Sequence, residues 1–270
     1  RATITNPDGS ASTDQGIWIA HETDATPVVI TGQQIPGRPA GFTFAGAILQ
    51  GLNNNNQVIF NAVAPALSTN TQGLWIGTDQ NNLRPIIGSA GASVPVIKPD
   101  GAPSKTYIPP QAFYGAQLNN AGQVAFAARD DNAKAGLWIE YNGTVAPVAI
   151  EGGPAPGAPS GSLFNAFDTD IADFSGVENP GYAFNDAGDI AFIASVDVPT
   201  TSGIQTFDGI WAGQPGNLQL IALQGQPTPA QGGQPVFGNL FNLLLNDLGQ
   251  VVFVSDNGLW LADPIQGLSL

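Results

Sequence analysis

The five tryptophans of this 270-residue chain constrain its fold more than any other feature of the sequence. Each stands third in a Gly-Ile-Trp or Gly-Leu-Trp segment: Trp18, Trp75, Trp138, Trp211 and Trp260. A second segment, which begins with Asn, precedes the last four at intervals of 66, 66 and 61 residues: Asn53, Asn119, Asn185 and Asn246. A nearly constant period of this length is the sequence signature of a repeat architecture.

The asparagine segments predict tight turns between strands. Three of the four carry Gly three residues after the Asn: Gly122, Gly188 and Gly249. This order favours a type I turn, because Asn bonds its own backbone and Gly accepts a positive φ at no steric cost. In the first copy Asn56 replaces the Gly, so that turn needs Asn in a left-handed conformation.

Strand-like segments surround each turn. Around Asn119 they are residues 113–118 and 123–128, followed by 136–141 with Trp138 and by 144–150. Four consecutive antiparallel strands with short connections form a meander. Aromatic residues after the Pro/Gly-rich loops are interpreted as anchors that hold each loop on its sheet: Phe42, Phe44, Phe164, Phe167 and Phe237.

The strand after each turn indicates how the sheets pack. It holds Phe at one fixed place, at Phe60, Phe126, Phe192 and Phe253, and its alternate residues are apolar on both faces. A sheet with one solvated face would alternate apolar and polar residues, so each sheet needs a neighbour on both sides. We therefore predict an all-β fold of four-stranded antiparallel modules arranged as a five-bladed β-propeller, with an open β-repeat array or solenoid as the alternative.

The whole chain, 1-270, is predicted to be a single β-repeat domain. Its modules are expected at about 1-44, 45-110, 111-178, 179-238 and 239-270. The first and last modules contain only part of the repeat. We expect residues 1–5 to join the sheet around Trp260 and close the ring; the alternative is strand exchange between copies, head to tail, giving a homopolymer.

Composition excludes some classes of function. The formal net charge is −14 with only seven Lys and Arg, whereas nucleic acids and anionic membranes require clustered positive charge. No apolar run approaches the length of a membrane span. Charged residues make up 10% of the chain, and Cys and Met are absent, which suits an exported bacterial protein that is extracellular or at the cell surface.

The repeat resembles the bacterial exported tandem-repeat proteins with an N-x-x-G-x-x-x-F motif, which often carry a PEP-CTERM-type sorting signal. Three copies match in full: Asn119, Gly122 and Phe126; Asn185, Gly188 and Phe192; Asn246, Gly249 and Phe253. The first copy matches at Asn53 and Phe60 only. The resemblance implies export and a repeat fold, and it implies no established activity.

Residues that could carry chemistry are few. His21 is the only histidine and is expected to be solvent-exposed. Glycoside hydrolysis needs two acids that face each other on rigid strands, and Glu140 and Asp189 are the main strand acids. Asp168, Asp170 and Asp173 are a weak candidate for Ca²⁺, which takes several closely spaced oxygen ligands; a solvated acidic loop is the preferred interpretation. No other cofactor is expected.

These features together predict a non-enzymatic extracellular structural or adhesive protein, for example a subunit of a surface assembly or filament. Its expected partners are further copies, or an extracellular matrix or glycan. A lectin-like carbohydrate-binding propeller is the alternative, because the five indole rings could stack on sugars if they were exposed. A glycoside hydrolase is less favoured than either.

Overall fold

The computed structural model describes residues 2–5, 11–64, 71–87, 96–97, 103–104, 115–129, 134–141, 143–167, 181–229 and 236–269. Within these ranges every regular element is a β-strand, and no helix is present that could cross a membrane.

The N-terminal strands form two small antiparallel sheets, β1-β2 and β3-β4. Their bounds are β1 (Ala2–Thr5), β2 (Ala11–Asp14), β3 (Gly16–His21) and β4 (Asp24–Ile30). The next sheet has the order β5-β6-β7-β8. Its strands are β5 (Gly46–Leu52), β6 (Val58–Ala64), β7 (Thr71–Gly77) and β8 (Leu83–Ile87).

The fourth and fifth sheets along the chain are larger. The β9–β14 sheet has the order β10-β9-β14-β13-β12-β11. Its strands are β9 (Val96–Ile97), β10 (Pro103–Ser104), β11 (Gln117–Leu118), β12 (Val124–Arg129), β13 (Ala135–Tyr141) and β14 (Thr144–Ile150). The β15–β19 sheet has the order β15-β17-β18-β19, and β16 also pairs with β17. Its strands are β15 (Leu163–Phe167), β16 (Tyr182–Phe184), β17 (Ile190–Thr200), β18 (Gly203–Gln214) and β19 (Asn217–Leu223).

The last sheet has the order β20-β21-β22-β23. Its strands are β20 (Leu240–Leu245), β21 (Val251–Ser255), β22 (Gly258–Asp263) and β23 (Gly267–Ser269). Two sheets therefore have the expected four strands. The β9–β14 sheet is wider because β9 adds to β14 in parallel. The β15–β19 sheet is wider because β15 and β16 pair with successive parts of β17.

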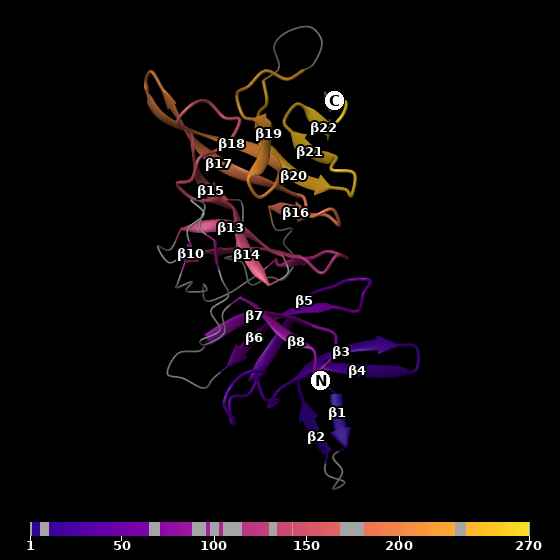
Figure 1. Cartoon of the computed structure of the whole chain (residues 1–270). Coiled ribbons are helices and arrows are strands. Elements are labelled where there is room, and N and C mark those ends of the chain that lie inside the picture. The colour runs from indigo at the N-terminus through magenta and orange to yellow at the C-terminus, as the bar shows by residue number, and fades with distance from the viewer. Residues whose placement is uncertain are drawn as a thin grey trace.

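The all-β prediction is confirmed, but the described sheets do not form a closed ring. They follow one another in chain order, and Figure 1 places the β3-β4 sheet and the β20–β23 sheet at opposite ends of the molecule. Ala2–Thr5 does not join the sheet around Trp260: β1 pairs with the nearby β2. The local hairpin closes only a short loop, whereas the last sheet lies at the far end of the molecule. The predicted module boundaries stay a prediction.

Consecutive sheets pack through opposite faces of the central strands. Phe126 and Trp138 pack against the preceding sheet, together with Ile59 and Leu74. Their neighbours on the other face, Ala125 and Leu137, pack against Phe192 and Trp211 of the following sheet. The same alternation of faces occurs where the β3-β4 sheet meets the β5–β8 sheet and where the β15–β19 sheet meets the β20–β23 sheet. The apolar residues predicted on both faces are therefore buried because each internal sheet has a neighbour on each side.

The glycine of each Gly-x-Trp segment leaves room for the indole. A Cβ on Gly209 would lie 2.5 Å from Cη2 of Trp211, and one on Gly16 would lie 3.0 Å from Cη2 of Trp18. The strand register also shifts immediately before Trp18, Trp75, Trp138 and Trp211. Such a β-bulge re-aims a side chain, which here turns the large ring along the sheet.

The aromatic residues after the loops contact these indoles. Phe44 lies 5.2 Å from Trp75, Phe164 lies 4.9 Å from Trp211 and Phe237 lies 5.2 Å from Trp260, between ring centroids. All three pairs are edge-to-face, the geometry that aromatic pairs prefer. These contacts agree with the interpretation of the rings as loop anchors.

A matched pair of substitutions tests the stacking. Leu137 and Leu259 stand at the same repeat position, one residue before the Trp, but Leu137 is fully buried whereas Leu259 is 61% exposed. We expect Leu137→Ala to lower the free energy of unfolding by about 2–5 kcal/mol and Leu259→Ala by less than about 1 kcal/mol, in urea unfolding of dilute protein. Equal losses would contradict the described order of the sheets.

Candidate functional site

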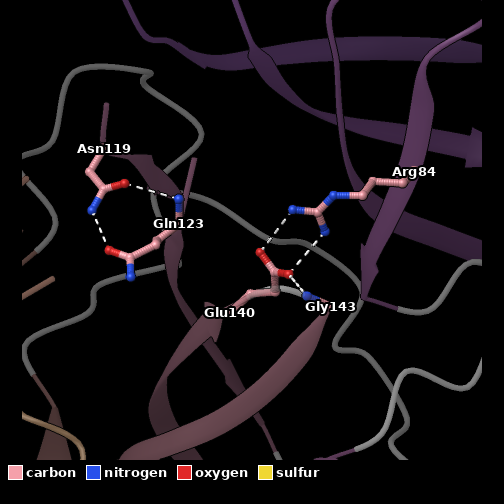
Figure 2. A network of polar contacts seen from close by, with 5 residues as sticks. All are labelled: Arg84, Asn119, Gln123, Glu140 and Gly143. Carbon is pink, nitrogen blue, oxygen red and sulfur yellow. Dashed lines mark hydrogen bonds and ion pairs between the residues drawn. The ribbon is translucent and has the colours of Figure 1, made fainter. Parts of the chain in front are cut away.

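Each asparagine turn is closed by its own side chain. The backbone N–H of Gly122 donates to the carbonyl of Asn119, and the N–H of Asn119 donates to the carbonyl of Gln123. The side-chain oxygen of Asn119 accepts the N–H of Gln123 at 2.9 Å, and its Nδ2 donates to Oε1 of Gln123 at 2.7 Å. Figure 2 shows this pair. The turns at Asn185 and Asn246 repeat the geometry, as does Asn53, where Asn56 adopts φ 58°.

The second hydrogen of each side-chain amide joins one sheet to the next. Nδ2 of Asn53 donates to the carbonyl of Asn119 at 3.0 Å, Nδ2 of Asn119 to that of Asn185 at 3.0 Å, and Nδ2 of Asn185 to that of Asn246 at 2.9 Å. We call these three bonds the asparagine ladder. The three donor residues are buried, whereas Asn246 at the end of the ladder is exposed. The repeated Asn therefore serves both the turn and the stack; the sequence predicted only the turn.

The residue after each ladder Asn forms a parallel set of bonds. The N–H groups of Asn54, Asn120 and Asp186 donate to the side-chain oxygens of Asn120, Asp186 and Asp247, respectively. The N–H and side-chain amide of Asn120 hold the pKa of Asp186 below its usual range. Because the folded-state pKa is lowered, this contribution to stability is present above the ordinary value of 3.8 and is lost as the pH falls through the folded-state pKa.

Replacing the amide by a carboxylate tests the ladder separately from the turn. Asn119→Asp keeps the acceptor that closes the turn but places an oxygen against the carbonyl of Asn185. We expect it to cost about 2 kcal/mol of unfolding free energy at neutral pH, as an unmet buried acceptor does. Asn246→Asp makes the same change at an exposed position and should cost less than about 1 kcal/mol in urea unfolding. Equal costs would show that the ladder bond contributes nothing.

One ion pair crosses from the β5–β8 sheet to the β9–β14 sheet. Nη1 and Nη2 of Arg84, on β8, donate to the two oxygens of Glu140, on β13, at 3.0 and 3.1 Å. The N–H of Gly143 also donates to Glu140, as Figure 2 shows. The side chain of Glu140 is fully buried, whereas that of Arg84 is 43% exposed. The bidentate geometry is the strong form of such a pair.

This pair distinguishes one interface from the others. At the position of Glu140, two residues after the Trp, the other repeats carry Ala20, Gly77, Gly213 and Ala262. A buried charge among small residues is the signal that could have identified the pair in the sequence. Sequence reasoning considered Glu140 only as a candidate catalytic acid. Both its oxygens accept bonds from Arg84, so in the structure it joins two sheets.

Removing only the arginine tests this role. Arg84→Met leaves the Glu140 carboxylate buried without its cation, so we expect a loss of about 2 kcal/mol of unfolding free energy, between the values for exposed and buried pairs. Adding Glu140→Gln to this variant should recover part of the loss, because an amide still accepts the N–H of Gly143. Urea unfolding at neutral pH measures both, and an Arg84→Met variant as stable as the wild type would contradict the assignment.

The other residues singled out in the sequence lie apart. His21 is exposed at the end of β3. Asp189 is bonded to Asn185 and lines the interface with the last sheet, whereas Glu140 lies at the interface with Arg84, so the two acids belong to different interfaces. Asp168, Asp170 and Asp173 lie outside the described residues, and within those residues no three His, Cys, Asp or Glu side chains group as metal ligands.

Four of the five indole rings are unavailable to a ligand. Trp75, Trp138, Trp211 and Trp260 are at most 2% exposed, and Trp18 is partly buried. The indole N–H of Trp211 donates to the carbonyl of Pro156 at 2.8 Å, which ties the loop to the sheet. Sugar-stacking surfaces need exposed rings. The tryptophan slot therefore serves packing between sheets.

The chain belongs to DUF7453, a family of unknown function whose model matches residues 1–260. No curated protein matches it. Among solved structures it is similar to the polysaccharide lyase Uly1, at 8% sequence identity and a TM-score of 0.30. The match covers 84% of this chain and 49% of the lyase, so the chain spans about half the length of that protein. A likeness at this score carries no argument about fold or activity.

Proposed function

We propose that this DUF7453 protein is a non-enzymatic structural protein of the bacterial cell exterior. In this proposal its sheets form an open repeat array, the alternative to the β-propeller, that associates end to end with other copies. The observation that carries the proposal is the asparagine ladder, in which the most regular side chains of the sequence bond one sheet to the next. The low charged fraction, 10%, and the absence of Cys and Met support a place outside the cell.

The last sheet has an apolar face that no described residue covers. One cross-strand row consists of Phe241, Val254 and Leu259, and the next of Leu244, Val252 and Leu261. Phe241, Leu244 and Leu259 are 40%, 65% and 61% exposed. We call these six residues the end face. Contiguous exposed apolar surface of this kind marks an interaction site on a soluble protein.

The internal interfaces indicate what covers a face of this type. Leu74, Leu137 and Ile210 stand at the repeat position of Leu259, and all three are fully buried under the next sheet. Asn246, beside the end face, repeats the residue whose Nδ2 donates across the last three internal interfaces. A second copy, which carries the same kind of sheet, is therefore the occupant we propose, since head-to-tail contacts of one type generate filaments.

Sedimentation velocity with two charge-introducing variants tests this proposal. Wild-type protein should sediment as larger species as its concentration rises, and Leu259→Lys should abolish this, because it would bury a charge in the apolar contact. Ile204→Lys is the control, since Ile204 is 72% exposed in the β17-β18 hairpin, outside the end face. A wild type that stays monomeric at every soluble concentration, or equal effects of both variants, would contradict end-to-end association.

A further inference from the structure

A pocket of about 650 Å³ opens where the β15–β19 sheet meets the β20–β23 sheet. Its volume lies within the range of small-molecule sites. It is lined by residues of β18 and β19 on one side and by the Asn246 turn and the β22-β23 hairpin on the other. Two differences in side chains distinguish this interface from the one between the β5–β8 and β9–β14 sheets.

The first difference is the residue that follows each asparagine turn. In the β5–β8 and β9–β14 sheets this residue is Gln, and its Oε1 lies close over the glycine of the next turn: 2.8 Å from a Cβ position on Gly122 for Gln57, and 3.0 Å from one on Gly188 for Gln123. In the β15–β19 sheet the residue is Asp189, which is one methylene shorter. Its Oδ2 lies 3.9 Å from the corresponding position on Gly249, so the interface is filled less closely there.

The second difference concerns the ion pair between Arg84 and Glu140. Arg84 lies opposite the residue after Trp75, and Gln219 lies opposite the residue after Trp211, so the two are equivalent. Ala262 stands two residues after its Trp, where Glu140 stands in the β9–β14 sheet. Both Gln219 and Ala262 line the pocket. Smaller side chains therefore stand here at the positions where a guanidinium and a carboxylate meet between the β5–β8 and β9–β14 sheets.

The charge of the pocket is negative. Asp189 and Asp263 line it, and among the residues that the structure describes no Lys, Arg or His does. The Gln250 side chain and two backbone N–H groups hold the pKa of Asp263 below its usual range, so this carboxyl is ionised at neutral pH. Asp189 accepts a bond from Asn185 through Oδ2 at 3.3 Å, and within the described residues its Oδ1 has no hydrogen-bond partner. One carboxylate oxygen is therefore free to receive a donor from a ligand.

The remaining lining is mixed. Ile221, Leu248 and Leu268 supply apolar contact, and the amide side chains of Gln214, Asn217 and Gln219 lie among them. An aliphatic stem would bury its surface against the leucines, at about 25 cal/mol per Å² of apolar area removed from water. A ligand with a negative charge is excluded by the two carboxylates.

We propose that this pocket binds a small organic cation, an ammonium or guanidinium group on an aliphatic stem, with its charged group at Asp189. The stem lies along Ile221 and Leu248. This site is independent of the end face, so a failure of end-to-end association leaves it untouched.

Titration calorimetry with agmatine tests the site, because agmatine carries a guanidinium and an ammonium on a four-carbon stem. Asp189→Gln restores the residue that follows the other three asparagine turns, so it keeps the turn while closing the space over Gly249. We expect it to abolish agmatine binding without lowering the unfolding temperature. Asp189→Asn removes the charge but not the space and should weaken binding about tenfold or more, the value of a charge-assisted hydrogen bond.

Glu22→Gln is the matched control, because it removes one negative charge at an exposed position in the β3-β4 hairpin, at the other end of the molecule. It should bind agmatine like the wild type, and succinate should not bind any of the proteins. The proposal is overturned if wild-type protein does not bind agmatine, if Asp189→Gln and Asp189→Asn both bind it as the wild type does, or if Glu22→Gln weakens binding as much as they do.

Discussion

The structure depends on the two hydrogens of one asparagine side-chain amide. One closes the turn within a sheet, and the other reaches the carbonyl of the equivalent Asn in the next sheet. A buried amide with an unmet hydrogen costs about 1–3 kcal/mol, so each buried turn is stable only with its neighbour in place. Local turn formation and long-range stacking are thereby coupled through Asn53, Asn119 and Asn185.

Apolar packing supplies the larger stabilisation and uses the same period. In each internal sheet the Phe and Trp of the central strands face the preceding sheet, and the residues beside them face the following one. The β-bulges at Trp18, Trp75, Trp138 and Trp211, and the close approach of the indole to glycine at Trp18, Trp138 and Trp211, are local adjustments to the large ring. A single four-stranded sheet would leave both faces in water, so stability requires several in a row.

Most repeat positions carry similar residues in every sheet. Individual interfaces differ at the few positions where one sheet carries a different residue. Arg84 and Glu140 place a buried ion pair across one interface, in a slot that otherwise holds small residues. At another interface Asp189 replaces the Gln that follows the other turns, and a negatively charged pocket lies beside it. The same backbone arrangement therefore carries a closed, self-paired site in one place and an open one in another.

The sequence by itself determined the local structure: the turns, the strands beside them, the tryptophan slot and the need for cover on both faces, because these follow from turn chemistry and from the alternation of side chains along a strand. Only the tertiary structure decided how the sheets follow one another in space. A ring and an open stack bury the same faces and differ in the angle between neighbouring sheets, which no local pattern encodes. The partners of Arg84 and of Asn119 across the interfaces follow from that arrangement, as do the exposure of Leu259 and the pocket beside Asp189.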